Sequence, residues 1–318
     1  MSDHLSNVPN HFLASLSVQD AELLKPHLST KPLPHAAVLH EQTGAISRVY
    51  FPTAGLVSLV VVMSNGEAVE AAVVGRNGVV GGSSALDGSI ALNRAIVQAP
   101  GSASSIAAAA LKQLAGQSES LRAALFQHEQ VITAHMQQIA ACNAVHHLEE
   151  RLCRWFLQVR DLLQTDALPL TQEFMANMLG VRRTSLTMVA RSLQAAGLIK
   201  YRRGRVEVVD VEGLHEAACE CYEAINGYYE QLIGWRPAVA EQSRPARIAR
   251  SGGHSNSPHP PGPQRPSPVA QPGRCGGSMG AWTTLVRYPH WPHSYAIKPG
   301  SCRSGAMRRI SSMCPLHR

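Results

Sequence analysis

The fold of this chain is decided by one segment, which runs from Leu170 to Val208 and reads LTQEFMANMLGVRRTSLTMVARSLQAAGLIKYRRGRVEV. Between Glu173 and Glu207 the segment contains no acidic residue. It does contain seven basic residues, which are Arg182, Arg183, Arg191, Lys200, Arg202, Arg203 and Arg205. A carboxylate that faced a row of phosphates would oppose the counterion release that drives nucleic-acid binding. This charge pattern therefore indicates a surface that binds a polyanion.

The spacing of small and apolar residues in the segment predicts a helix-turn-helix. When Gln172 is counted as position one, Ala176 is fifth, Gly180 ninth, Leu186 fifteenth and Val189 eighteenth. A small fifth residue lets the second helix cross the first closely, and a glycine at the ninth position adopts the left-handed conformation of the turn. The two apolar residues then bury the inner face of the second helix.

The outer face of the second helix is expected to carry hydrogen-bond donors. These are Arg183, Thr184, Thr187 and Arg191, with Arg182 and Ser185 at the start of the helix. A helix N-terminus itself favours phosphate. Two short β-pieces follow around a basic tip that includes Arg202 and Arg203, which predicts a hairpin wing suited to the DNA backbone. The alternative, an ordinary solvated helix pair, would usually mix both signs of charge.

The basic segment lies within an otherwise acidic region. The chain has 318 residues, a formal net charge of +7 and 45% hydrophobic residues, which is enough for two domains with buried cores. Residues 1–235 hold 17 Lys and Arg against 21 Asp and Glu, whereas residues 236–318 hold 12 against one. The positive net charge therefore belongs to the C-terminal tail.

That tail, residues 234–318, is interpreted as disordered. It holds 13 of the 20 prolines and shows no apolar periodicity that could bury a face. A basic arm that binds nucleic acid without specificity is an alternative function for it. Its mixture of Arg, Pro, Ser, Gly, His, Trp and Cys also resembles GC-rich DNA translated out of frame.

The chain is expected to be cytoplasmic, with reduced thiols and no membrane partner. Its seven cysteines are scattered and odd in number, which does not indicate the disulfide framework of a secreted protein. The N-terminal residues lack the basic and long apolar regions of a signal peptide. The longest apolar run, from Leu56 to Met63, is too short to span a bilayer.

Sequence patterns predict an α+β protein. Short β-rich pieces between turn signals predict a β-roll or jelly-roll sensor domain over residues 10–117, which begins with a short helical lead-in. A dimerisation helix is predicted over residues 118–148, and a winged helix-turn-helix domain over residues 149–233.

The long predicted helix carries a stripe with heptad-like steps of three and four. The members of the stripe are Leu121, Leu125, His128, Ile132, His135, Ile139, Cys142 and His146. Because a single helix cannot bury such a stripe on itself, we expect a partner helix from a second subunit to cover it. The stripe therefore predicts a homodimer.

These features together resemble the Crp–Fnr family of transcriptional regulators. The resemblance covers roughly residues 10–233, and its most specific parts are TQEFMANMLGVRRTSLTMVARSLQAAGLIKYRRGRVEV and HLEERLCRWFLQVRD. It implies a homodimer that binds a near-palindromic site in double-stranded DNA and contacts RNA polymerase. It also implies that Thr171 and Gln172 touch phosphate, that Arg183 reads guanine and that Ser185 binds the backbone.

The chain departs from the family at several positions. Thr184 stands where many members have a glutamate, and Met188 replaces a second base-reading arginine, so known half-sites should not be transferred. The predicted sensor lacks the glutamate that binds the ribose of a cyclic nucleotide, and Asn93-Arg94 stands about where an Arg-Ser pair binds the phosphate. We therefore expect no usual binding of cyclic AMP. Arg94 is a weak candidate for contact with an unknown effector.

No metal site, catalytic site or required cofactor is predicted. Cys142 and His146 have the i, i+4 spacing of two metal ligands, but the spacing fixes no further ligand, and a dimer seam with a few polar residues explains them. Cys219 and Cys221 lie two apart in a predicted helix, where side chains point away from each other. Residues 1–141 contain no cysteine for the iron–sulfur cluster of an oxygen sensor.

The predicted function is therefore that of a DNA-binding regulator and not of an enzyme, because the sequence shows no nucleophile–base constellation. The alternative is a ligand-sensing module whose output is protein–protein contact. In that case the basic segment would dock an acidic partner.

Overall fold

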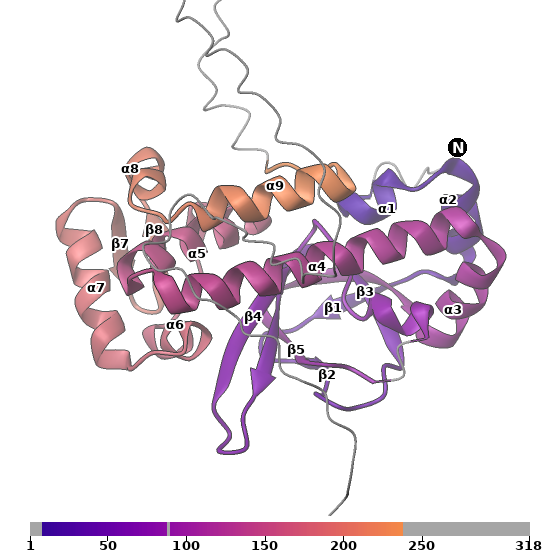
Figure 1. Cartoon of the computed structure of the whole chain (residues 1–318), viewed down its shortest axis with the longest axis horizontal. Helices are drawn as coiled ribbons and strands as arrows, with labels where there is room; N and C mark the ends of the chain where they lie inside the picture. The colour runs from indigo at the N-terminus through magenta and orange to yellow at the C-terminus, as the bar shows by residue number, and fades with distance from the viewer. Residues whose placement is uncertain (1–7, 88–89, 238–318) are drawn as a thin grey trace, which may run out of the picture. The chain divides into compact units, whose positions relative to one another are not determined.

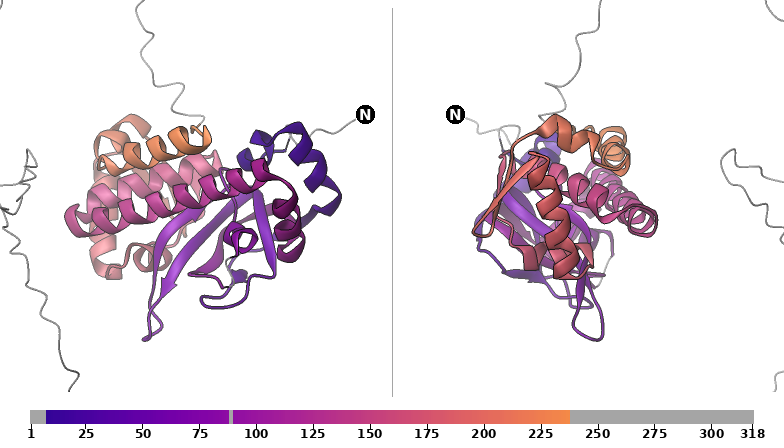
Figure 2. Two further views of the ribbon diagram at one scale, coloured as in Figure 1. Left: turned by 45° about the vertical axis from the view of Figure 1, so that its right-hand side comes forward. Right: turned by 90° about the vertical axis from the view of Figure 1, so that its left-hand side faces the viewer.

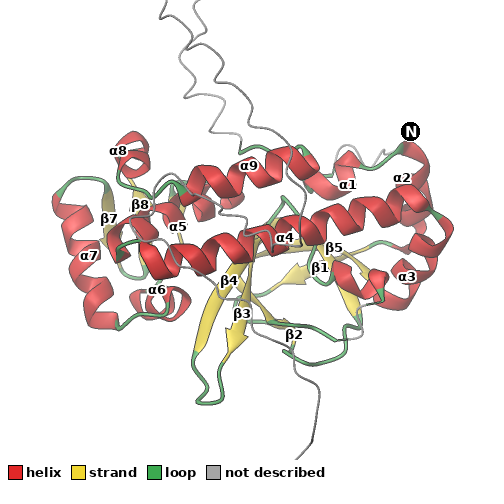
Figure 3. Ribbon diagram, viewed as in Figure 1, coloured by secondary structure: helices red, strands yellow, loops and turns green. Residues whose placement is uncertain are grey.

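The helix-turn-helix segment lies at one end of a mixed helix and sheet structure (Figures 1 and 3). The computed structural model describes residues 8–87 and 90–237. The tail that the sequence predicts to be disordered lies outside the described residues from 238 onward. None of the helices in the described part is both long and apolar enough to cross a membrane.

The N-terminal part is a sheet domain with short helices at its margins. Its strands are β1 (Ser29–Leu33), β2 (Val38–His40), β3 (Arg48–Val62), β4 (Ala68–Val74) and β5 (Arg94–Ala107). Its helices are α1 (His11–Ser15), α2 (Val18–Leu24), η2 (Lys25–His27), η3 (Gly82–Leu86) and α3 (Ala108–Gln117).

All strand pairs in the five-stranded sheet are antiparallel. The strand order is β1-β5-β3-β4, and β2 also pairs with β5. The long strands β3 and β5 pair from Arg48 opposite Ala107 to Val60 opposite Arg94, with register shifts between Pro52 and Val57 that bend the sheet. The short β-rich pieces of the sequence therefore fold into one sheet domain, as predicted.

Two helices connect the sheet domain to the C-terminal part. The longer is α4 (Glu119–Val145), which begins where the Ser118 hydroxyl accepts from the Leu121 amide. His146 ends α4, and α5 (Leu148–Leu163) follows after a capping box formed by His147 and Glu150. The helix α9 (Cys221–Ile233) runs along α4 on the side away from most of the sheet (Figure 2).

The apolar stripe on α4 is covered within the same chain, and the prediction that a helix of a second subunit covers it was wrong. The stripe from Leu121 to Cys142 is buried within the same chain, against η3, β4 and α9. His128 Nε2 accepts a hydrogen bond from the Val79 amide at 3.0 Å, and His135 Nδ1 lies 3.3 Å from the Tyr229 hydroxyl. An apolar stripe shows that a helix is covered, but it does not show which element covers it.

The C-terminal part is a small winged helix domain. Its elements are β6 (Ala167–Leu168), α6 (Gln172–Leu179), α7 (Arg183–Ala195), β7 (Ile199–Arg202), β8 (Arg205–Val208) and α8 (Val211–Glu216). The three strands form an antiparallel sheet in the order β6-β8-β7.

A buried hydrogen bond joins the sheet domain to α5. Trp155 on α5 donates its indole N–H to Glu70 Oε1 on β4 at 2.6 Å, and the Ser58 hydroxyl donates to Glu70 Oε2 at 2.6 Å. Both Trp155 and Phe156 belong to a core that also includes apolar residues of β3, β4 and α6. The sheet domain and the winged helix domain therefore share one core.

Burial raises the pKa of the Glu70 carboxyl to about 7, against the opposing effects of Ser58, Trp155 and Arg154. The folded state therefore holds this proton more tightly than the unfolded state. The stabilisation from that proton is complete below the ordinary pKa of 4.5 and is lost as the pH rises to about 7. We expect Glu70→Gln to remove this part of the pH dependence and to exceed the wild type in stability above pH 7, by up to about 3 kcal/mol.

Urea unfolding of both proteins across this pH range measures the effect. Glu67→Gln is the matched control, because Glu67 is an exposed carboxylate in the β3–β4 turn and should leave the pH profile unchanged. Parallel profiles for the wild type and Glu70→Gln would contradict the assignment.

Candidate nucleic-acid interface

The first helix of the helix-turn-helix is α6, and its ends are set by local chemistry. The Thr171 hydroxyl accepts a hydrogen bond from the Phe174 amide at 3.2 Å and so caps the helix start. At the other end Gly180 has a φ of 64°, in the left-handed region that the turn requires. The small residue Ala176 is buried at the crossing with α7, as the sequence predicts.

The second helix, α7, separates an inner and an outer face. Leu186, Ala190 and Leu193 are buried on the inner face, whereas Val189 is only half-buried. On the outer side and at the helix start the predicted residues are exposed or half-buried, and these are Arg182, Arg183, Thr184, Ser185, Thr187 and Arg191. The predicted recognition residues therefore reach solvent from the first three turns of α7.

The wing is a two-stranded hairpin with a tight basic turn. Arg202 pairs with Arg205 across the hairpin, and the two turn residues Arg203 and Gly204 have φ values of 47° and 76°. Positive φ at both central positions is typical of the turns whose twist matches a two-residue hairpin. All seven basic residues between Glu173 and Glu207 are exposed, and none forms an ion pair within the described part of the chain.

Polar contacts that the sequence did not indicate hold α6, α7 and the wing together. The Thr187 hydroxyl lies 3.0 Å from Gln172 Oε1 and 2.8 Å from the Arg183 carbonyl, either of which accepts its proton. The Tyr201 hydroxyl accepts from the Gln172 amide at 3.3 Å, and the Tyr201 amide donates to Gln194 Oε1 at 2.9 Å. Thr187 and Gln172 are thus tied to each other besides facing outward.

A buried arginine supports the interface from behind. The Arg151 guanidinium on α5 donates to the Leu179 carbonyl at the end of α6, at 2.6 Å. An arginine among the other charged residues of α5 gives no sequence signal for this role, because arginines are mostly found on surfaces.

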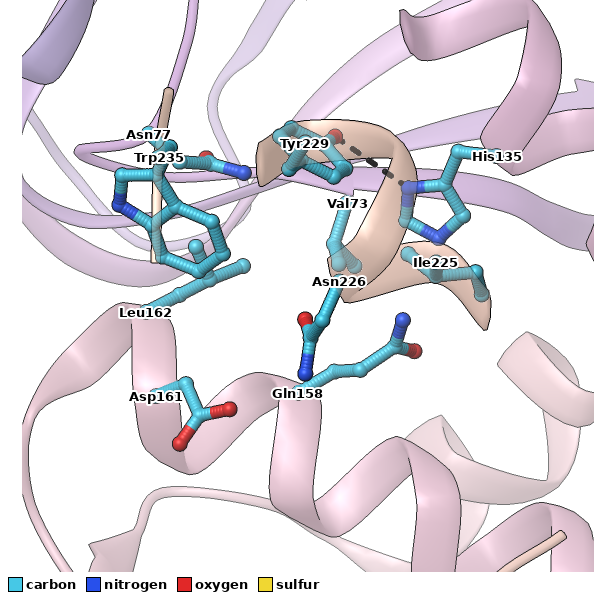
Figure 4. Close-up of a pocket in the computed structure, with 10 residues that line it drawn as sticks. All are labelled: Val73, Asn77, His135, Gln158, Asp161, Leu162, Ile225, Asn226, Tyr229 and Trp235. Carbon is cyan, nitrogen blue, oxygen red and sulfur yellow. Dashed lines mark hydrogen bonds between the residues drawn. The ribbon is translucent and has the colours of Figure 1, made fainter. Parts of the chain in front are cut away.

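Two spaces of very different size lie at the junction of the sheet domain with the C-terminal part. One pocket, between β4, α4, α5 and α9, is lined by His135, Gln158, Asp161, Tyr229 and Trp235 among others (Figure 4). Its volume of about 10 Å³ suits about one water molecule. A second, open groove of about 270 Å³ lies between His35 and Gln98 of the sheet domain and the start of α6.

The proposed effector residue Arg94 is already paired. Its Nε lies 2.8 Å from Glu41 Oε2, and its side chain is 35% exposed. Arg94 lines neither the junction pocket nor the groove.

Part of the chain matches a known protein family. The family model described as a Crp-like helix-turn-helix domain matches residues 150–217. No curated protein sequence matches the chain.

Similar solved structures share the fold. FixK2 from Bradyrhizobium japonicum has a TM-score of 0.53 at 14% identity, with coverage of 60% of this chain and 98% of FixK2. The c-di-GMP-responsive global regulator CLP of Xanthomonas campestris has a TM-score of 0.51 at 17% identity, covering 61% and 100%. A CRP/FNR-family transcriptional regulator from Thermus thermophilus has a TM-score of 0.51 at 22% identity, covering 60% and 98%.

Because their sequence identities to this chain are low, the solved structures show a similar fold and nothing more. The family model adds a match to a helix-turn-helix domain, which the sequence resemblance implied. Residues 150–217 thus match a Crp-like helix-turn-helix domain, and the described part of the chain has a fold similar to that of a solved CRP/FNR-family regulator.

Proposed function

We propose that the protein is a homodimeric, sequence-specific DNA-binding regulator that acts on transcription in the cytoplasm. The observation that carries this proposal is the exposed basic surface of α7 and the wing. Seven positive side chains reach solvent there with no ion-pair partner among the described residues. Such a surface is suited to phosphate, which supplies most of the affinity of DNA-binding proteins.

Within this surface the residues divide by role. Arg183 is the first residue of α7 and is exposed, so it can enter a major groove and donate two hydrogen bonds to guanine. Arg182, Ser185, Arg202 and Arg203 surround it and are assigned to the DNA backbone. Thr171, Gln172, Thr184, Thr187 and Arg191 complete the proposed contact surface.

A face of α4 supports the homodimer. Exposed residues recur on it at steps of three and four, and these are Ala123, Phe126, Gln130, Thr133, Gln137, Ala140 and Ala144. None of them is charged, although an exposed helix face 22 residues long normally carries charges. Phe126 and Val145 are exposed by 56% and 75%. We infer that this face, opposite the buried stripe, packs against α4 of a second subunit.

Dimerisation through α4 would place two copies of α7 in successive major grooves. A two-fold axis between the subunits then requires a near-palindromic site with half-sites about one helical turn apart. Contact with RNA polymerase is part of the same proposal and rests on family resemblance.

The sheet domain is proposed to sense an effector that is not cyclic AMP bound in the usual way. The pairing of Arg94 with Glu41 supports this, because an arginine held by a carboxylate is a poorer partner for a cyclic phosphate.

We predict that Arg183→Ala and Arg203→Ala will weaken DNA binding in different ways. Arg183→Ala should cost roughly 1–3 kcal/mol on the best site and relax the preference at one position of each half-site. Arg203→Ala should weaken binding to all sequences alike and reduce the slope of log affinity against log salt by about 1. Selection from a random DNA pool, followed by affinity measurements at several salt concentrations, separates the two outcomes.

Lys31→Ala is the matched control, because Lys31 is an exposed cation on β1 of the sheet domain. Equal effects of the Arg183 and Arg203 substitutions would refute the assignment of α7 as the reading helix. If the full chain binds no duplex DNA with or without cell extract, the protein-docking alternative becomes the better reading.

We also predict that Thr133→Glu or Ala140→Glu will dissociate the dimer. Each substitution brings like charges together across a two-fold axis, which should weaken association by about tenfold or more. Light scattering after gel filtration measures the mass, and affinity for the palindromic site should fall in parallel. Gln113→Glu on α3 adds the same charge to an exposed site elsewhere and should leave the mass unchanged. A stable dimer in both α4 variants would exclude this face.

A further inference from the structure

Three cysteines and a histidine converge where α4 meets the turn between α8 and α9. Cys142 lies in the last turn of α4, and His146 is the residue that ends the helix. Cys219 lies in the turn after α8, and Cys221 is the first residue of α9. The three thiols are buried, with at most 5% of any of these residues exposed. Groups separated by up to 79 residues in sequence thus meet at one point.

The sequence-based expectation that Cys219 and Cys221 point apart was wrong. It assumed that both lie within one helix, but α8 ends at Glu216 and α9 begins only at Cys221. Glu220 forms the boundary of α9, so Cys219 sits in the irregular turn before it. The turn directs both thiols toward Cys142 and His146.

The distances in this cluster match those around a single metal ion. The four donor atoms all lie within 4.8 Å of one another. Cys142 Sγ and Cys219 Sγ are 3.6 Å apart, and Cys221 Sγ is 3.6 Å from His146 Nδ1. A tetrahedral zinc ion with Zn–S bonds of about 2.3 Å would place neighbouring sulfurs about 3.8 Å apart.

The surroundings of the cluster have the arrangement of an outer coordination shell. The far ring nitrogen of His146, Nε2, lies 3.0 Å from Glu220 Oε2, so the carboxylate orients the ring and leaves Nδ1 facing the thiols. Gln138 donates its amide N–H to Cys221 Sγ at 3.1 Å. Metal-binding histidines almost always donate their second ring N–H to a carboxylate, a carbonyl or water, as His146 can to Glu220.

Two buried arginines add an electrostatic argument. Arg151 and Arg154 are exposed by 8% and 2%, and neither forms an ion pair with a residue that the structure describes. Both lie close enough for their charges to act on the Cys142 thiol. Buried cations need a compensating negative charge, and the Glu70 carboxyl near Arg154 supplies it only in part because burial raises its pKa to about 7. Three thiolates around one divalent ion would supply a net charge of about −1.

We propose that Cys142, His146, Cys219 and Cys221 bind one zinc ion in a closed, structural Cys₃His site. A disulfide between Cys142 and Cys219 would use two of the four donors. It would not explain why Glu220 orients His146 toward the thiols. An iron–sulfur cluster distributes its ligands over several irons, which requires donors farther apart than these. With four protein ligands the ion has no open position, so its role is to hold structure.

The ion would fix the joint between the two domains. His146 ends α4 and is followed directly by His147, the N-cap of α5. A metal bond at this point would tie the end of α4 to the start of α9. The winged helix domain lies between these two points in the sequence.

The test uses the full, untagged chain, purified with reductant and without chelator, and measures zinc by mass spectrometry. We expect about one zinc per folded chain. Cys142→Ser and Cys219→Ser should each reduce it at least about tenfold. Cys153→Ala is the control for a buried thiol outside the cluster, and serine at Cys275, Cys302 and Cys314 together controls for the tail. Both controls should keep the zinc.

A measurement on the wild type remains valid if the cysteine variants fail to fold. X-ray absorption at the zinc edge should report three sulfurs at about 2.3 Å and one nitrogen at about 2.0–2.1 Å. Glu220→Gln, which alters only the orienting carboxylate, should retain zinc but lose it to a competing chelator roughly 10-fold more readily.

Four results would overturn the proposal. The first is a folded, reduced wild type that takes up no stoichiometric zinc even after reconstitution, and the second is zinc that is lost only when the tail cysteines are replaced. The third is iron with acid-labile sulfide in place of zinc, and the fourth is a Cys142–Cys219 disulfide in the reduced preparation.

Discussion

The burial of α5 is the constraint on which the rest of the structure depends. Eleven of its 16 residues are buried, and these include polar and charged side chains that must find partners inside the protein. Trp155 bonds to Glu70 of the sheet domain, Arg151 bonds to the end of α6, and Asp161 accepts from the Tyr222 hydroxyl of α9 at 2.6 Å. Each bond reaches a different element, so α5 fixes the sheet domain, the helix-turn-helix and the last helix against one another. Breaking any one of them would leave a buried polar group unpaired, at a cost of roughly 1–3 kcal/mol.

The helix-turn-helix could be predicted from the sequence because its determinants are local. Ala176 must be small where two helices cross, and Gly180 must adopt positive φ, whatever the rest of the chain does. The wing follows the same logic, since Arg203 and Gly204 form a two-residue turn between strands that pair in register. The exposure of the proposed recognition residues followed from helical periodicity alone. What local rules could not reveal is the second set of contacts, such as Tyr201 against Gln172, because these depend on how the helices and the wing meet.

Features that depend on packing between distant elements were missed for a common reason. The apolar stripe of α4 was correctly recognised as buried, but its cover is provided by the sheet domain and α9, and no sequence pattern distinguishes these from a second subunit. The uncharged opposite face was overlooked because alanine, glutamine and threonine do not form an apolar stripe. The Cys–His cluster was missed because the sequence does not show that α8 stops at Glu216, and a continuous helix would have turned Cys219 away.

The Cys–His cluster, like α5, lies where distant parts of the chain are held together. If the protein acts as the proposed regulator, a change in the sheet domain must reach α7, and the covalent route between them runs through α4 and the joint at His146 and His147. A loose joint would let the winged helix domain turn without reference to the sheet domain. The Glu70–Trp155 bond restrains α5 near β4, while the cluster lies where α4 ends and α9 begins. Two restraints at different points determine an orientation, whereas one restraint permits rotation about itself. A metal at the joint would therefore confine the movement of α7 to changes that the sheet domain itself imposes.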